Sequence, residues 1–101
     1  MTIELLNQED DEARVAVLKA LADPTRLQIL RLLLQHSPEE VGCSIFNEQM
    51  PISPSALSYH LSTMRNAGLT ATRKESREKY VSIRPETFDK FVPGFLSSLS
   101  A

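Results

Sequence analysis

The stretch SPSALSYHLSTMRNAGL, residues 53–69, decides how this chain folds. Ser53 followed by Pro54 is typical of a helix start, because serine caps the first turn and proline suits the first helical position. Gly68 favours a stop directly after Ala67, because glycine adopts the left-handed conformation that ends many helices. The stretch therefore predicts one helix that begins after Ser53 and runs to about Ala67.

The two faces of this expected helix differ in chemistry. At about 100° per residue, Leu57, Leu61 and Met64 share one side, which predicts the packed face. A solvated helix usually carries Lys and Glu on the other side, whereas neutral donors and acceptors suit base edges in a DNA major groove. Both interpretations stay open on this feature alone. The opposite side here is uncharged and rich in hydrogen-bonding groups: Ser55, Tyr59, Ser62 and Asn66.

The flanking segments give this helix a context. Ile45, Phe46 and Met50 suggest a short helix over about 44–50, so that residues 44–67 form a helix-turn-helix. After Gly68 the pattern changes to short apolar runs on either side of a charged middle, 73–79. We expect a β-hairpin over 69–84 with a flexible charged loop, and a hairpin directly after a helix-turn-helix is a wing.

The remaining segments complete a mainly α fold with a small β-hairpin. Asp23-Pro24 predicts a buried, leucine-rich helix over about 24–35, preceded by a helix over 12–22 with Val15, Leu18 and Ala22 at helical spacing. Residues 37–40 have capping-box spacing and are expected to open a short turn. In the tail, Pro93 predicts a break near Val92 and a short helix over about 93–99.

Composition bounds the function. The chain has 101 residues, a formal net charge of −2, three glycines and one cysteine, Cys43. These values predict one domain, 1–101, without a disulfide framework or a glycine-rich phosphate loop. We see no leader, no apolar run long enough for a membrane span and no catalytic constellation, so we expect a cytoplasmic protein that is not an enzyme.

The charge is unevenly distributed. Residues 1–12 hold five acidic side chains and no basic one, whereas residues 60–84 hold six basic side chains against Glu75 and Glu78. A basic stretch alone is usually a solvated surface. Here it coincides with the second helix of the helix-turn-helix and with the wing, and that combination favours double-stranded DNA as a partner.

The chain resembles the ArsR/SmtB family of small bacterial winged-helix repressors over roughly residues 14–84. The resemblance is carried by LKALADPTRLQIL at 18–30, by Ser53 and Ser55, by LSYHL at 57–61, by RNAGL at 65–69 and by Arg73-Lys74. It implies a homodimer that places one recognition helix per subunit in successive major grooves of an approximately palindromic operator. It also implies repression that an effector relieves.

The candidate DNA-binding residues follow from the helix face, the basic segment and the resemblance. His60 lies about 60° from the apolar centre of its helix, so partial burial with one hydrogen bond, or a phosphate contact, is favoured over base readout. The family often has glycine at the wing tip, and Glu75-Ser76 here predicts a looser turn. The candidates are Ser53, Ser55, Ser58, Tyr59, His60, Ser62, Thr63, Arg65 and Asn66 on the helix, and Arg73, Lys74, Arg77 and Lys79 in the wing.

We expect no metal and no cofactor. Family members with a Cys-x-Cys metal pair carry it at positions that here are Gly42 and Ser44, with Cys43 between them. A lone thiol is a poor site for a soft metal. Cys43 as a redox sensor, including a bridge between two subunits, remains an alternative to a half-buried structural cysteine. Glu39 and Glu40 oppose formation of its thiolate.

The termini, 1–22 and 85–101, are expected to form the dimer interface. Packing of the apolar tail onto the chain's own core is the other interpretation, and the two are compatible. An effector could be an organic ligand at this interface or a protein partner, or abundance alone could be the signal. The second functional hypothesis is a winged-helix protein-interaction module without DNA binding. The dimer candidates are Leu5, Leu6, Phe88, Phe91, Phe95, Leu96 and Leu99.

Overall fold

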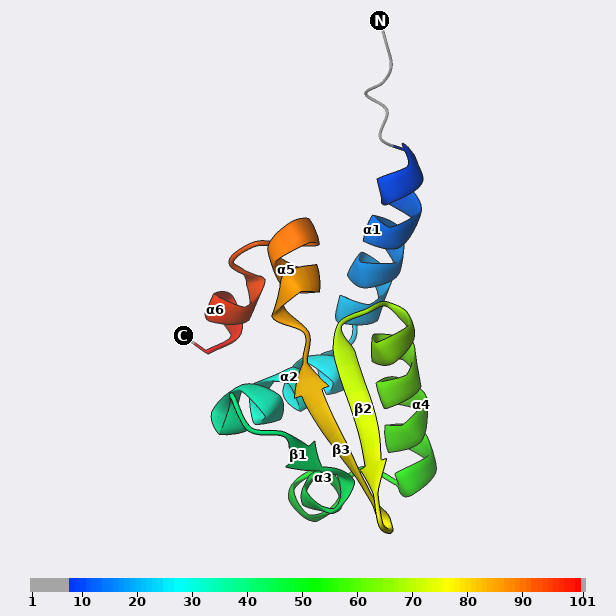
Figure 1. The fold of residues 1–101 in the computed structure, drawn as a ribbon, viewed down its shortest axis with the longest axis vertical. Coiled ribbons are helices and arrows are strands. Elements are labelled where there is room, and N and C mark those ends of the chain that lie inside the picture. Colours follow the sequence, from blue (N-terminus) through cyan, green and yellow to red (C-terminus); the bar gives the residue numbers. More distant parts are fainter. Residues whose placement is uncertain (1–7, 101) are drawn as a thin grey trace, which may run out of the picture.

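The computed structural model describes residues 8–100. Helices surround a small antiparallel sheet, and α1 and the hairpin turn lie at opposite ends of the molecule (Figure 1). None of the helices within 8–100 is long and apolar enough to cross a membrane. The elements are α1 (Gln8–Leu21), α2 (Pro24–His36), β1 (Val41–Gly42), α3 (Cys43–Gln49), α4 (Pro54–Asn66), β2 (Thr70–Glu75), β3 (Glu78–Ile83), α5 (Pro85–Phe91) and α6 (Phe95–Leu99).

The two central helices each begin with a capping residue followed by proline, as predicted. The Asp23 carboxylate accepts a hydrogen bond from the backbone N–H of Arg26 at 3.1 Å, and the Ser53 hydroxyl accepts one from the backbone N–H of Ala56 at 3.1 Å. Each cap satisfies a backbone donor that the helix itself leaves free, which is worth about 1 kcal/mol. These caps fix where α2 and α4 begin, and α3 and α4 form the expected helix-turn-helix.

The sheet is larger than predicted. Its strand order is β1-β3-β2, with all neighbours antiparallel. β1 is only two residues long, too short to leave a periodic pattern. Ser37 turns out to cap the end of α2 rather than to start a helix, so residues 37–40 form the short turn that leads into β1.

The prediction of a flexible loop over 73–79 is wrong. The hairpin stays in register from Thr70↔Ile83 to Glu75↔Glu78, and only Ser76 and Arg77 form the turn. Ser76 adopts φ 60°, the left-handed conformation that a two-residue hairpin turn demands and glycine more often supplies. The turn is therefore tight, not loose, because ladder hydrogen bonds continue through the charged residues.

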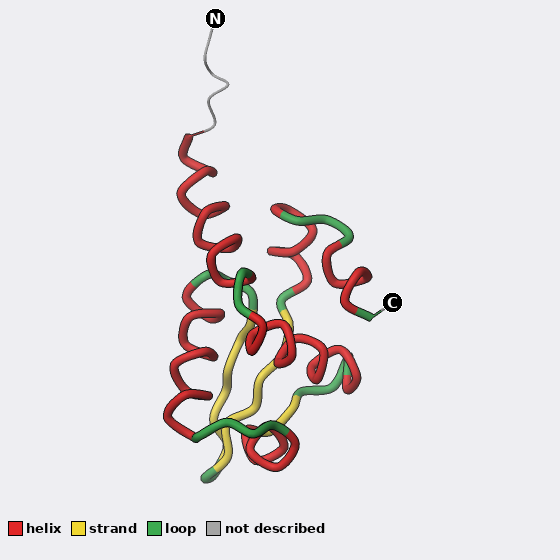
Figure 2. The backbone as a smooth tube through the Cα atoms, turned by 180° about the vertical axis from the view of Figure 1, so that it is seen from behind, coloured by secondary structure: helices red, strands yellow, loops and turns green. Residues whose placement is uncertain are grey.

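The core forms around α2 and the packed face of α4. Every apolar residue predicted for the packed side of α4 is buried, and α2 is the buried centre that its leucines predicted. Figure 2, seen from the side opposite to Figure 1, shows α2 crossing in front of the sheet, between α4 and the C-terminal helices. The largest buried side chains include Phe46, Ile29, Leu30, Leu33, Met64, Leu69, Val41 and Val81.

α1 buries only one of its apolar faces. Val17, Ala20 and Leu21 pack into the core, whereas Val15 and Leu18 are 46% and 49% exposed. Helical spacing predicts the helix but does not say which of its apolar faces the chain's own core covers. The helix also begins at Gln8, four residues before the predicted start.

The C-terminal tail breaks at Val92 as predicted, and α6 begins after Gly94, which has φ 85°. Phe88 is only 1% exposed, so its assignment to a dimer interface is wrong: the side chain belongs to the chain's own core. It stacks on Phe95 with ring centroids 6.3 Å apart. Phe91, Phe95, Leu96 and Leu99 are half-buried against the core, and Leu5 and Leu6 lie outside the described residues.

Candidate nucleic-acid interface

The outward face of α4 carries the predicted polar residues. α4 lies along β2 on the outside of the molecule (Figure 1), and Tyr59 at 65% is its most exposed large side chain. Ser53 is also exposed, but its hydroxyl already caps the helix. Ser62 and Thr63 are half-buried, while the exposed residues of this set are Ser55, Ser58, Tyr59, Arg65 and Asn66.

His60 has a structural contact, as the helix angle predicted. It is half-buried, and its Nδ1 lies 3.1 Å from Nη1 of Arg26. Because a guanidinium is always protonated, Arg26 donates and His60 accepts. Arg26 Nε also donates to the carbonyl oxygen of Ala20 at 2.7 Å. One side chain of α2 thus joins the end of α1 to α4, a role that nothing in the local sequence around Arg26 indicates.

The two faces of the hairpin differ sharply in charge. On the face away from α4, Arg73 donates to Glu40 at 2.7 Å and to Glu75 at 2.6 Å, and its guanidinium lies 4.9 Å from the centroid of the Tyr80 ring. Hydrogen bonds to Glu75 and then Glu40 raise the pKa of Arg73 above its ordinary value. Arg73 therefore has its charge locally neutralised, which removes much of the reason for assigning it to DNA.

The face toward α4 keeps its cations. Successive strand residues alternate between faces, so Thr72, Lys74 and Lys79 share the side opposite to Arg73. Lys74 and Lys79 stand directly across from each other in the hairpin. Neither they nor Arg65 forms an ion pair with any residue in the range 8–100. Positive charge is therefore concentrated on this side of the wing. The two lysines repel each other, because like charges directly opposite in a hairpin are destabilising.

Glu78 ties the wing to the helix-turn-helix. Its carboxylate accepts a hydrogen bond from the Ser44 hydroxyl at 2.6 Å, next to the start of α3. A Cβ on Gly42 would lie 2.7 Å from Oε2 of Glu78, so a larger residue at position 42 would displace this carboxylate from its present position. Glu78 therefore anchors the hairpin to α3, and this contact between segments far apart in sequence was not predicted.

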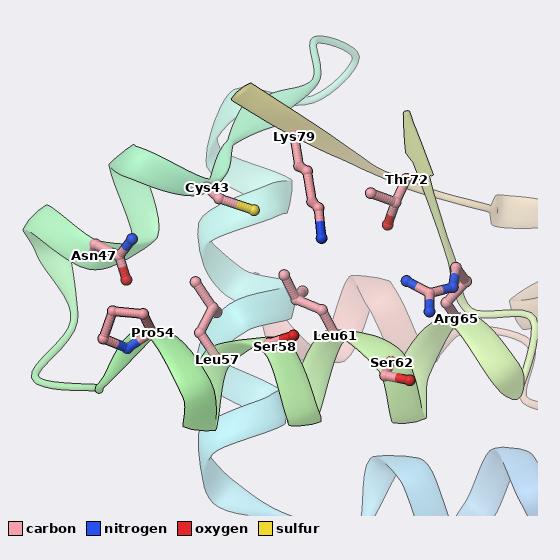
Figure 3. Close-up of a pocket in the computed structure, with 10 residues that line it drawn as sticks. All are labelled: Cys43, Asn47, Pro54, Leu57, Ser58, Leu61, Ser62, Arg65, Thr72 and Lys79. Carbon is pink, nitrogen blue, oxygen red and sulfur yellow. The ribbon is translucent and has the colours of Figure 1, made fainter. Parts of the chain in front are cut away.

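Cys43 lies where α3, α4 and the hairpin meet (Figure 3). The side chain is half-buried against the core, which confirms the predicted partial burial of this residue. Burial and, secondarily, the nearby Glu78 carboxylate raise the pKa of the Cys43 thiol. The acid that opposes the thiolate is thus on the hairpin, rather than Glu39 or Glu40. Across residues 8–100, the structure shows no cluster of three metal-ligating side chains.

Comparison with known proteins agrees with this geometry. The family model "Bacterial regulatory protein, arsR family" matches residues 23–71. A curated relative, the uncharacterized HTH-type transcriptional regulator YceK of Bacillus subtilis, is 48% identical over 93% of this chain and 93% of its own length. The transcriptional activator HlyU of Vibrio cholerae is 37% identical over 80% of this chain and 73% of its own length.

Solved structures show the same fold. HlyU from Vibrio cholerae superposes with a TM-score of 0.71 and 33% identity over 89% of this chain and 90% of that one. HlyU from Vibrio vulnificus gives a TM-score of 0.68 and 34% identity over 98% of this chain and 100% of that one. These relatives are regulators, not enzymes. With its winged helix-turn-helix and these relatives, the chain belongs to the arsR family of bacterial regulatory proteins, a family of DNA-binding transcriptional regulators.

Proposed function

We propose that this regulator is a repressor that binds an approximately palindromic operator as a homodimer and leaves it when an effector binds. The observation that carries the proposal is the arrangement of charge around α4. Arg65, Lys74 and Lys79 lack ion-pair partners among the described residues and flank an exposed, neutral helix face, whereas Arg73 on the other side is neutralised. Cations that position and neutral groups that read bases are the two parts of a DNA interface.

The proposal gives each part a role. Tyr59, Ser55 and Asn66 on the exposed face of α4 would contact base edges in the major groove. Lys74, Lys79 and Arg65 would contact phosphates, and Arg77 would reach DNA from the hairpin turn. His60 would not contact DNA but would fix the position of α4 through its hydrogen bond with Arg26. Of the wing candidates, only Arg73 is assigned to the structure of the protein.

A second copy of this chain would cover the exposed side of α1. Val15 and Leu18 are about half exposed there. α1 also contacts α5: the Arg14 guanidinium lies 5.4 Å from the centroid of the Phe91 ring, and Lys90 Nζ lies 3.8 Å from Asp10 Oδ1. α6 packs against α2, where Arg31 donates to the Leu99 carbonyl at 3.4 Å. The proposed interface therefore centres on α1 and α5.

The dimer is tested by placing a charge in this surface. We expect Leu18→Glu to be monomeric in sedimentation equilibrium while keeping its circular dichroism spectrum, because the buried face of α1 is untouched. Lys19→Glu, the neighbouring exposed residue, is the matched control and should remain dimeric. A Leu18→Glu variant that stays dimeric contradicts an interface on α1.

The proposed sign of regulation follows the family's repressors. Relatives of this chain include the putative arsenical resistance operon repressor ArsR of Halobacterium salinarum, as well as the activator HlyU. A regulator bound across a promoter excludes polymerase without needing any further contact. A reporter gene placed behind an operator selected from random duplex DNA should therefore be less active when the regulator is expressed, and increased reporter expression would contradict repression.

The central experiment is selection of bound fragments from random duplex DNA. We expect an inverted repeat whose half-sites are centred about one helical turn apart, roughly 10 base pairs. Binding to it should weaken steeply with salt, since each phosphate contact releases counterions. Failure to enrich any sequence, together with no salt-dependent binding of duplex DNA, would favour the protein-interaction module instead.

A further inference from the structure

A cavity of about 280 Å³ lies between α3, α4 and the hairpin (Figure 3). Leu57 and Leu61 of α4 form its apolar floor, and Thr72 and Lys79 reach it from the two strands of the hairpin. Figure 3 shows the Lys79 side chain extending toward α4 and the Arg65 guanidinium extending into the same space. This volume is close to the lower end of ligand pockets, roughly 300 Å³, so an occupant would be a small molecule.

The charge of the cavity is one-sided. Arg65 and Lys79 line it, and no aspartate or glutamate does. Cys43 also lines it, and burial, followed by the Glu78 carboxylate outside the lining, raises the pKa of this thiol. The thiol therefore adds no negative charge near neutral pH. Two cations without an acid between them favour an anionic ligand.

A threonine hydroxyl forms part of the wall of the cavity. The Thr72 Oγ1 atom is buried and has no hydrogen-bond partner among residues 8–100. In Figure 3 this oxygen points into the space between Lys79 and Arg65. Buried polar groups are nearly always paired in folded proteins, but Thr70 Oγ1 of the same strand is also unpaired and does not line the cavity. The Thr72 hydroxyl therefore belongs to the polar wall of the cavity without marking the position of a ligand.

We propose that this cavity binds a small organic anion, a carboxylate on a compact apolar body, and that the bound anion competes with DNA. The competition rests on the proposed function, because Arg65 and Lys79 are assigned there to phosphates. The carboxylate engages both cations, and the apolar body covers Leu57 and Leu61. A DNA phosphate would use the same cations but would gain nothing from an apolar floor, so the cavity suits the organic anion better.

The test uses benzoate as the probe and the full chain without DNA. We expect saturable shifts of the backbone amides around the cavity in two-dimensional NMR spectra. Benzyl alcohol, which has the same ring without the charge, should bind at least about tenfold more weakly, since a charge-assisted hydrogen bond is lost. Equal binding of benzyl alcohol and benzoate, or no saturable binding of benzoate, overturns the site.

Variants locate the site. Arg65→Gln and Lys79→Gln should each weaken benzoate binding at least about tenfold. Lys74→Gln is the matched control, because Lys74 lies directly across from Lys79 in the hairpin but does not line the cavity. All three side chains are exposed, so the variants should fold. An equal loss in all three variants contradicts the site and indicates non-specific attraction to a basic surface.

The competition has its own experiment. Saturating benzoate should raise the Kd of the selected operator duplex at least tenfold, whereas sodium chloride at the same ionic strength with benzyl alcohol should not. Unchanged operator binding at saturating benzoate overturns the competition. If the protein binds the operator but not benzoate, only the proposed site is overturned. If it binds benzoate but no duplex DNA, only the proposed function is overturned.

Discussion

Two lysines, Lys74 and Lys79, stand opposite each other in the hairpin, and this pair predicts opposite effects on stability and on DNA binding. Lys74 faces Lys79 directly, and neither has an ion-pair partner among the described residues. Their repulsion is a cost to the folded wing, and the proposed reason for it is contact with DNA phosphates. The change Lys74→Gln should therefore stabilise the protein and weaken DNA binding at the same time.

The magnitudes can be worked out separately. Removing one like-charge cross-strand pair should gain about 0.5 kcal/mol, which raises Tm by roughly 2–4 °C in a domain of this size. Each lost phosphate contact lowers the slope of log affinity against log salt by about 0.9, so a dimer with two such contacts loses about 1.8. Taking equal affinity of the two proteins at 1 M salt as the reference, this difference in slope corresponds to about 60-fold weaker binding at 0.1 M salt and about ninefold weaker binding at 0.3 M.

Arg73→Gln is the matched control for this prediction. It changes the net charge by the same amount on the neighbouring residue, but Arg73 is already bound to Glu40 and Glu75. Fluorescence anisotropy with the selected operator at four salt concentrations gives the slopes, and thermal unfolding at low salt gives Tm. If Arg73→Gln lowers the slope as much as Lys74→Gln does, net charge rather than local contact governs binding, and the reasoning from the hairpin faces is refuted.

Three further predictions test the helix, the turn and a cap. Tyr59→Ala should reduce discrimination between operator and scrambled duplex in competition anisotropy, because this side chain is the most exposed large one on α4; unchanged discrimination contradicts base readout. Arg77→Ala should weaken binding to all duplexes by similar factors, and a loss confined to one base pair would argue against a phosphate role. The cap hydrogen bond to the Arg26 N–H lowers the pKa of Asp23 below its ordinary 3.8. The stabilisation is therefore complete above that ordinary value and disappears as pH falls through the lowered one. Asp23→Asn, which still caps, should show a flatter dependence of unfolding free energy on pH in this acid range, and an unchanged dependence would refute the assignment.

Local chemistry predicted the helix-turn-helix well. Ser53 and Asp23 each precede a proline, and both the cap and the fixed backbone angle of proline act within one helical turn. The buried face of α4 followed from spacing alone. The hairpin was predicted, but its turn was not, because a left-handed serine at position 76 leaves no signal as clear as glycine.

Contacts between distant segments explain what the sequence could not predict. Arg73 looked like a free wing cation until the fold brought Glu40 to it from 33 residues away. Phe88 looked like an interface residue because an apolar terminus does not reveal whether its own core has room for a ring. The candidate cavity has the same origin, since its residues come from two helices and two strands.

The hydrogen bonds of Arg26 have a mechanical consequence. Its guanidinium bonds the carbonyl oxygen of Ala20 at the end of α1 and the ring of His60 in the middle of α4. A rotation of α1 must therefore either break these bonds or turn α4 with it. The orientation of the proposed DNA-reading surface on α4 is thus coupled to that of α1 through one side chain, without passing through any of the loops that join the helices in sequence.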